Sequence, residues 1–348
     1  MTILIGCAET LNPFIARLRE ALRAHPAIDD VRHDLEMFWE GNNEIDVVHL
    51  HWPRALFPNW NVSPSADLSK LETRLTDWKK QAPIATTVHN IRAHRQSNGD
   101  LSDRLYRLIY RYSDGFVHMG RSSQRLLHEA YDVPERDEAI IPHGQYDTRP
   151  NEVSKEQARW KLRIPEEAVL ALVFGALRDP DELSLVLEGA KWWETPSKHM
   201  LVAGRFTWTS GALQTHATRW YQRLQTFGRP ISFRFDRFDD DCLQYFLNAA
   251  DVLLIPRLRV LNSGNVALGF TFGRVVVGPN TGVVGEVLEE TGNPVFDPDT
   301  PGSVGRALGE ACMLSKKGKG GSNAEYAREN MDWSDIADQY VRFYRGLS

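Results

Sequence analysis

The sequence predicts an α/β protein made of two doubly wound parallel sheets, each in its own domain, and two observations support this. Short apolar runs alternate with longer amphipathic segments, which is the pattern that βαβ units and a parallel sheet produce. The chain has 348 residues, of which 42% are hydrophobic and 25% are charged. Because that length exceeds one average domain and the apolar content suffices for two cores, we expect two domains of similar size that face each other.

Apolar runs predict the strands of both domains. The first series covers 2–7, 46–52, 83–90, 115–120 and 138–144. The second series covers 169–177, 199–205, 230–235, 250–256 and 274–279. Amphipathic segments between these runs predict helices, and the clearest of them cover 13–25, 68–81, 102–113, 181–193 and 239–250.

A polar segment, 149–167, separates the two series of strands and carries Pro150 and Pro165. Such segments often join domains, so we place a boundary there. The predicted parts of the chain are a first domain at 1–155, a second domain at 156–330, and a C-terminal helix at 331–348 that crosses back to the first domain.

Composition argues against several classes of function. A formal net charge of −5 argues against a nucleic-acid-binding protein, because such binding depends mainly on neutralising phosphates. Three scattered cysteines indicate a reducing compartment. The amino terminus predicts a strand rather than a signal peptide, and no apolar run approaches the roughly 20 residues of a spanning helix. We therefore expect a cytoplasmic protein, whose one flexible basic loop is predicted at Ser315–Asn323.

Polar residues follow many of the predicted strands. Ligands of open parallel sheets bind at the carboxyl ends of the strands, so these residues are the candidate site residues. In the first domain they are Asn12, His51, Trp52, His89, Asn90, His143 and Gly144. In the second domain they are Arg178, Arg205, Asn262, Ser263 and Gly264.

Histidines are concentrated in the first domain, where seven of the eleven lie between His49 and His143. Histidine suits proton abstraction from a hydroxyl group because its ordinary pKa lies near neutrality. His89 is the first candidate for a general base, since His89 and Asn90 end an apolar run with two polar groups, and His51 is the second. The alternative for each is a hydrogen-bonded packing residue.

Metal binding is a rival use of these histidines, and the sequence does not favour it. No H-x-x-x-H, H-E-x-x-H or Cys/His cluster is present, so we expect no metal site and no cofactor. The acidic run at Asp239–Asp241 is explained better as the N-cap and first-turn charges of the helix that follows it.

The turn Asn262–Gly264 predicts an anion site. The first amides of a helix lack backbone partners and carry partial positive charge, so this turn could hold a phosphate, and Gly264 has no Cβ to obstruct it. Arg178 and Arg205 follow other strands of the same domain and could bind a diphosphate, and Glu286 could accept from a sugar or ribose hydroxyl. The alternative is an ordinary helix capped by Ser263.

Ordered matches along nearly the whole chain resemble a known family. They are "NPFIARLREAL", "DVVHLHWPRAL", "PIATTVHNIRAHR", "IPHGQYD", "FGALR", "LNSGNVALGF", "GVVGEVL" and "DWSDIADQYVRFY". With these motifs the chain resembles GT-B glycosyltransferases, and among them bacterial exopolysaccharide enzymes of the xanthan-type GDP-mannose:glycolipid 4-β-mannosyltransferase group.

The resemblance implies a fold and a division of roles. It implies two facing Rossmann-like domains, with the acceptor on the first and the nucleotide sugar on the second. The donor residues it implies are Arg178, Ser263, Gly264 and Glu286, to which we add Arg205, Asn262, His143 and Gly144. The acceptor side is implied for His51, Trp52, His89 and Asn90, to which we add Asn12.

Two positions depart from the family pattern. Asp181 stands where relatives carry a lysine shortly after the arginine of "FGALR", which weakens the expected neutralisation of the donor phosphates. Val260 and Leu268 stand where many retaining members carry a pair of glutamates.

The predicted function is a metal-independent glycosyltransferase, inverting, with His89 as base and His51 as the second candidate. Its partners are a nucleotide sugar and a glycan or polyprenyl-diphosphate-linked acceptor. GDP-mannose follows from the resemblance alone, and a UDP-sugar is the main alternative donor. Two other functions stay open on the same fold: a non-catalytic sugar-nucleotide or glycan-binding partner, and a sugar-nucleotide epimerase.

One helix, at 101–112, suggests contact with an anionic membrane. It sets Arg104, Arg107 and Arg111 beside an apolar stripe, a pattern that can lie in a bilayer interface, here the inner face of the plasma membrane. The alternative is a core helix whose arginines form ion pairs on the protein surface.

Overall fold

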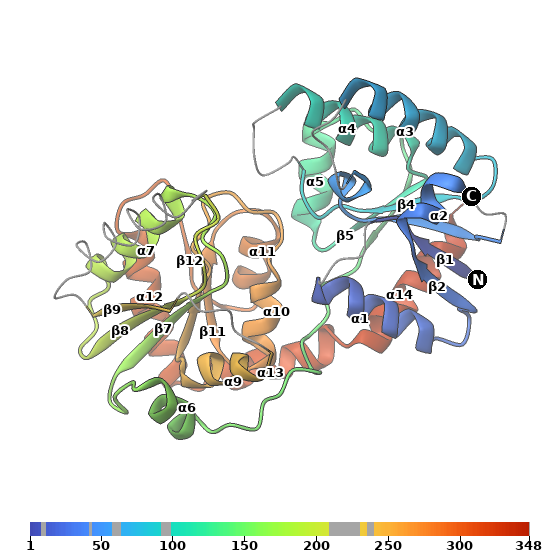
Figure 1. The fold of residues 1–348 in the computed structure, drawn as a ribbon. Helices are drawn as coiled ribbons and strands as arrows, with labels where there is room; N and C mark the ends of the chain where they lie inside the picture. Colours follow the sequence, from blue (N-terminus) through green and yellow to red (C-terminus); the bar gives the residue numbers. More distant parts are fainter. Residues whose placement is uncertain are drawn as a thin grey trace. The chain divides into compact units, whose positions relative to one another are not determined.

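The computed structural model describes residues 1–7, 12–41, 44–57, 64–91, 99–208, 230–234 and 240–347. The chain divides into two compact units, one formed by 1–144 with 331–348 and the other by 145–330 (Figure 1). Each unit is built on a six-stranded parallel sheet with helices around it, so the predicted fold class is confirmed.

The sheet of unit 1 has the strand order β2-β1-β3-β4-β5-β6. Its strands are β1 (Thr2–Ile5), β2 (Asp30–His33), β3 (Val47–Leu50), β4 (Ile84–Thr87), β5 (Gly115–His118) and β6 (Asp137–Ile140). In this order the winding direction reverses between β1 and β3, which is where a doubly wound sheet opens a crevice for ligands.

The helices of unit 1 lie on both faces of that sheet. They are α1 (Pro13–Ala24), α2 (Leu35–Glu40), α3 (Pro64–Trp78), α4 (Gly99–Tyr112), α5 (Arg121–Ala130) and α14 (Trp333–Gly346), with a 3₁₀ turn η1 (Pro53–Leu56). Figure 1 shows α1 and α14 on one side and α3 and α4 on the other. The end of the chain therefore completes the core of the unit in which the chain begins.

The sheet of unit 2 has the order β12-β11-β10-β7-β8-β9. Its strands are β7 (Val169–Phe174), β8 (Lys198–Ala203), β9 (Ile231–Arg234), β10 (Val252–Leu254), β11 (Val275–Pro279) and β12 (Val295–Phe296). Counted in chain order this is the 3-2-1-4-5-6 arrangement of a doubly wound sheet, whose switch point lies between β7 and β10.

The helices of unit 2 are α6 (Lys155–Leu162), α7 (Pro180–Trp192), α9 (Asp240–Ala249), α10 (Gly264–Thr271), α11 (Gly282–Glu290), α12 (Ser303–Lys316) and α13 (Lys319–Asn330). A single apolar cluster joins α7 and α12 to one face of the sheet. Local sequence sets several helix starts. Asp179 caps α7 in front of Pro180, and Ser154 with Gln157 forms a capping box on α6.

Two strands and one helical segment differ from the sequence-based expectation. β2 and β12 were not expected, because β2 reads as the mixed run "DVRH" with only Val31 fully buried, and β12 has two residues. The predicted loop at Ser315–Asn323 is wrong. Helices α12 and α13 occupy most of it and are separated by Lys317 and Gly318, the latter at φ 82°.

A buried side chain explains why that basic segment is ordered. Asn323 is fully buried and donates to the carbonyl of Arg274, and it exchanges hydrogen bonds with Asn293 at 2.8 and 2.9 Å. These bonds fix the second turn of α13 against Arg274 and Asn293, which lie next to β11 and β12. Among the helices of the described residues, none is both long and apolar enough to cross a membrane.

We expect Gly204→Ala to destabilise the protein by about 1–3 kcal/mol, because there is no room for a side chain. A Cβ at Gly204, which follows β8, would lie 1.7 Å from the carbonyl oxygen of Gly175, and backbone cannot move aside as a side chain can. The free energy of unfolding in urea measures the effect.

Gly309→Ala is the matched control for this change. Gly309 lies in α12, and a Cβ there meets no heavy atom within 4 Å, so we expect a gain of about 0.4–1 kcal/mol from reduced freedom of the unfolded chain. If Gly204→Ala were as stable as the wild type, the close approach of the two loops would not be a constraint on the fold.

Candidate functional site

A cluster of histidines lies at the carboxyl ends of β3 and β4 in unit 1. His49 belongs to β3, His51 follows that strand, and His89 follows β4. The rings of His49 and His51 lie with their centroids 4.2 Å apart, and His51 Nδ1 is 3.0 Å from His89 Nε2. The sequence-based candidates His51 and His89 therefore form one hydrogen-bonded pair beside the switch point of their sheet.

His49 supports the pair and has its own partners. Its Nδ1 lies 2.7 Å from the hydroxyl of Tyr344 in α14, and its Nε2 lies 2.8 Å from the hydroxyl of Thr87 in β4. A hydroxyl can donate or accept, so a neutral imidazole with one N–H satisfies both contacts. The side chain is completely buried, and we assign it a packing role.

Aromatic rings fix the orientation of His89. Trp52 stacks on it, with ring centroids 4.3 Å apart and an angle of 20° between the planes. Phe14 of α1 meets its edge at 5.3 Å and also contacts His143 at 5.0 Å. The imidazole of His89 is thus held between an indole and a phenyl ring, which limits its rotation.

Burial keeps the central histidines neutral. It lowers the pKa of His49 to about 3, and it is the main cause that lowers the pKa of His89 to about 3, with the neighbouring His143 and His49 adding to the effect. Burial also lowers the pKa of His51 well below its ordinary value, helped by the histidines around it. A charged imidazole is costly where water is excluded and no carboxylate compensates it.

Three other first-domain candidates have structural roles in unit 1. The side chain of Asn12 accepts from the backbone N–H of Phe14 and caps α1. The carbonyl of Asn90 accepts from the hydroxyl of Tyr110 at 3.1 Å. Gly144 lies against Trp333, since a Cβ at Gly144 would be 2.2 Å from the indole ring. The ligand roles of these three residues, and that of His143, stay predictions.

In unit 2 the predicted anion turn is the start of α10. Ser263 is the N-cap and accepts from the N–H of Asn265 at 3.4 Å, and Gly264 is the first helical residue. Asn265 donates to the carbonyl of Phe174, the last residue of β7, which ties this helix start to the switch point. The helix capped by Ser263, which the sequence offered as the alternative, is therefore present, and the anion site in this turn stays a prediction.

A buried ion pair that the sequence did not reveal lies at the same switch point. Arg257, which follows β10, forms an ion pair with Glu182 of α7 and donates to the carbonyl of Ala176 at 2.9 Å. Glu182 also accepts from the backbone N–H of Arg178 at 2.6 Å. The signal available in the sequence was the arginine that ends the run "ADVLLIPR", next to an apolar strand.

The remaining donor candidates differ in their surroundings. Arg178 is half-buried after β7, while Arg205 after β8 is exposed. Glu286 is half-buried in the second turn of α11. Asp181 is exposed in the first turn of α7. The carboxylate that contacts Arg178 and Arg257 is that of Glu182.

The helix with the arginine stripe, α4, uses its apolar residues for packing. Leu105 and Ile109 are fully buried in unit 1, whereas Arg104, Arg107 and Arg111 are exposed. Arg107 forms an ion pair with Asp103 at 2.7 Å. Leu105 and Ile109 therefore face the core, while the three arginines are exposed to solvent.

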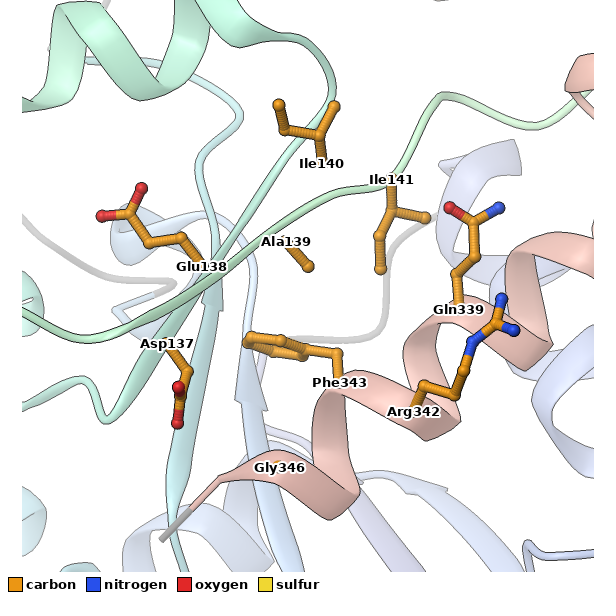
Figure 2. Close-up of a pocket in the computed structure, with 9 residues that line it drawn as sticks. All are labelled: Asp137, Glu138, Ala139, Ile140, Ile141, Gln339, Arg342, Phe343 and Gly346. Carbon is orange, nitrogen blue, oxygen red and sulfur yellow. The ribbon is translucent and has the colours of Figure 1, made fainter.

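A groove of about 350 Å³ lies elsewhere in unit 1, between the edge strand β6 and α14. Figure 2 shows Gln339 and Arg342 projecting from α14, with Phe343 facing β6. None of the predicted site residues lines it. In the part of the chain that the structure describes, no group of three or more histidine, cysteine or acidic side chains could hold a metal ion. Asp239 lies outside the described residues.

Comparison with solved structures identifies the fold. HepE of Anabaena in complex with UDP aligns with a TM-score of 0.75 at 12% identity, over 99% of this chain and 100% of that one. Sucrose-phosphate synthase of Thermosynechococcus elongatus aligns with a TM-score of 0.71 at 15% identity, over 99% and 98%. The chain has the GT-B glycosyltransferase fold.

A further GT-B structure, the UDP-forming α,α-trehalose-phosphate synthase of Burkholderia vietnamiensis, has a TM-score of 0.60 at 14% identity, over 92% of this chain and 78% of that one. HepE is also known in complex with UDP-glucose, and that structure aligns with a TM-score of 0.72. No protein-family model matches the sequence, and no curated protein matches it. At these identities the likeness establishes the fold, and the function rests on the sites.

We expect the stability of this GT-B chain to fall as the pH drops below about 6.5, the ordinary pKa of histidine. The pKa values of His49, His51 and His89 are lowered in the folded state, so only the unfolded chain takes up their protons in this range. The free energy of unfolding therefore has its full value above the pKa of histidine in the unfolded chain. Below that pKa, each of these histidines lowers the free energy of unfolding by about 1.4 kcal/mol per pH unit. Urea unfolding between about pH 6.5 and about pH 5 measures the slope.

The variant His89→Asn should flatten that slope by about one proton, because it removes one of the three groups. Equal slopes for the variant and the wild type would show that His89 titrates normally in the folded protein.

Proposed function

We propose that this protein is a glycosyltransferase that moves a sugar from a nucleoside diphosphate, bound by unit 2, to a hydroxyl group of an acceptor bound by unit 1. The observation that carries the proposal is that Arg178 and the start of α10 lie together at the switch point of the unit 2 sheet, where Asn265 of α10 donates to the last residue of β7. Guanidinium groups and helix-start amides are the groups that bind diphosphates in proteins. The GT-B fold, shared with HepE bound to UDP-glucose, supports the same assignment.

The donor base and sugar follow from weaker signals. The sequence resemblance favours GDP-mannose, while the likeness to HepE favours a UDP-sugar. A thermal-shift panel of GDP, UDP, dTDP and their sugars decides between them. A ligand that binds the native state stabilises it by about 2.7 kcal/mol at a hundredfold excess over Kd, which is easily measured. If no nucleotide raises the melting temperature, the glycosyltransferase assignment fails.

The chemistry that we propose is a direct, metal-independent displacement. The acceptor oxygen attacks the anomeric carbon, the bond from that carbon to the phosphate oxygen breaks, and the nucleoside diphosphate leaves with the bonding electrons. His89 takes the proton of the acceptor hydroxyl. Once protonated, both nitrogens of His89 carry hydrogen, so its Nε2–H donates to Nδ1 of His51, 3.0 Å away.

We propose an acceptor glycan carried on a polyprenyl diphosphate, as in the exopolysaccharide enzymes that the sequence resembles. In that case the enzyme works at the inner face of the plasma membrane, and the exposed arginines of α4 are its contact with anionic lipid.

Gly264→Val should weaken nucleotide binding at least about tenfold, since a branched side chain at the first residue of α10 obstructs the helix-start amides. Calorimetric titration with the nucleotide identified in the panel measures the loss. Gly309→Ala serves as the control, because it also adds a side chain at a helical glycine but lies in α12, where a Cβ meets no neighbour. Unchanged affinity in folded Gly264→Val would place the donor elsewhere.

His89→Asn should reduce turnover by about a hundredfold to ten-thousandfold while donor affinity stays within about twofold of the wild type. Steady-state kinetics and donor titration are measured on the same preparation. Near-normal turnover would move the role of base to His51. Donor binding without any turnover in the wild type would instead indicate a non-catalytic sugar-nucleotide-binding protein.

Removal of the positive charge at Arg104, Arg107 and Arg111 should reduce binding to anionic vesicles, because each basic residue near such a surface contributes about 1 kcal/mol. Co-sedimentation with vesicles at low and high salt measures the binding, and the melting temperature checks that the variant is folded. Equal binding to neutral and anionic vesicles, or no binding to either, would contradict the proposed contact of α4 with anionic lipid and would favour a soluble acceptor.

A further inference from the structure

The loop after β7 supplies little positive charge for a diphosphate. From Phe174 to Glu182 the sequence is "FGALRDPDE", which contains one cation, Arg178, and three carboxylates. Asp181 is exposed, but Asp179 and Glu182 belong to the switch point, where Asp179 caps α7 and Glu182 is buried. A second cation therefore has to come from another strand if two phosphates are to be neutralised.

Arg257 is the cation that the fold supplies. It lies three residues after Leu254, the last residue of β10, and β10 pairs directly with β7 across the switch point. The residue is 8% exposed, with one guanidinium nitrogen on Glu182 and another on the carbonyl of Ala176 at 2.9 Å. The contact with Ala176 fixes Arg257 beside the backbone of the loop that carries Arg178.

Glu182 is positioned to compete with a phosphate for this arginine. One of its carboxylate oxygens accepts both from the N–H of Arg178 and from Arg257. Those two donors, a backbone amide and a guanidinium group, are the same donors that a phosphate oxygen would take in a diphosphate site. The carboxylate of Glu182 thus accepts the two hydrogen bonds that a bound phosphate would otherwise accept.

The pair is a poor source of stability. A buried ion pair loses hydration that its mutual attraction often does not repay. Burial lowers the pKa of Arg257 to about 10, with the nearby Arg178 adding to the effect, and burial raises the pKa of Glu182. Both shifts indicate that the charges are incompletely compensated in this position. A ligand role therefore accounts for the buried pair better than a stabilising role does.

We propose that Arg257 binds the donor diphosphate and that Glu182 holds Arg257 in the empty protein, to be displaced by the phosphate when the donor enters. This inference rests on the proposed function, because it assumes that a diphosphate binds at the switch point of unit 2. Glu182 then lowers the affinity of the site, since the donor must break an existing ion pair before it can form its own.

The test is calorimetric titration with inorganic pyrophosphate and with the nucleotide found in the panel. Glu182→Gln keeps an oxygen for the N–H of Arg178 but removes the competing charge, so we expect about tenfold tighter binding. Arg257→Met should weaken binding by about tenfold to a hundredfold. Arg259→Met is the matched control, because Arg259 is exposed two residues away, and we expect no change.

Two further variants keep the test decisive. If Arg257→Met does not fold, Arg257→Lys takes its place; it keeps the positive charge and should bind with intermediate affinity. If Glu182→Gln does not fold, Glu182→Asp takes its place, because its carboxylate is one methylene further from Arg257. In the double variant of Arg257→Met and Glu182→Gln the tightening should disappear, because there is no longer an arginine to release.

The outcomes separate this inference from the proposed function. If the wild type binds the nucleotide but neither Glu182 variant tightens binding and Arg257→Met leaves it unchanged, the pair is structural and the inference is overturned while the function stands. If neither the wild type nor Glu182→Gln binds pyrophosphate or any nucleotide, both fail.

Discussion

The hydrogen bond between His49 and Tyr344 joins residues that lie 295 positions apart, and the arrangement of the first site depends on it. Tyr344 belongs to the C-terminal helix α14, and His49 belongs to β3 in the middle of the unit 1 sheet. Because the second nitrogen of His49 contacts Thr87 of β4, the same imidazole also connects two neighbouring strands. The positions of His51 and His89, which directly follow these two strands, therefore depend on this buried contact.

The second site is organised by a carboxylate rather than by a histidine. Glu182 accepts a hydrogen bond from the N–H of Arg178 in the loop after β7, and it forms an ion pair with Arg257 in the loop after β10. Since β7 and β10 are the two strands between which the winding reverses, this one side chain spans the switch point of the sheet. Asn265, which donates to the carbonyl of Phe174, holds the start of α10 to the same place.

The sequence was a good guide to the strands and to the residues that follow them, because buried parallel strands are continuous apolar runs and their carboxyl ends are marked by the first polar residue. That rule located His51, His89, Arg178 and Ser263. It failed for β2, an edge strand with a mixed sequence, and for the segment around Asn323, where tertiary hydrogen bonds order a run of lysines and glycines.

Pairing between distant side chains was the part that the sequence could not supply. Nothing local distinguishes His49, which packs against Tyr344, from His51, which contacts His89, since both point to the same side of one strand. In the same way Glu182 and Arg257 are 75 residues apart and each looks like a surface charge in its own segment. Only the order of the strands brings them together, and that order is a property of the whole sheet.

The two candidate sites share one electrostatic property. The histidines of unit 1 are held neutral by burial, and the arginines of unit 2 are balanced by Glu182 and Asp179. Neither site therefore carries a large excess charge before a ligand binds. Under the proposed function, a diphosphate bound by unit 2 has to replace Glu182 as the partner of Arg257. A proton taken up by His49, His51 or His89 in unit 1 has to offset the cost of a buried positive charge. In each unit, therefore, a newly arriving charge first meets the free-energy cost of the neutral arrangement that the folded chain has already formed.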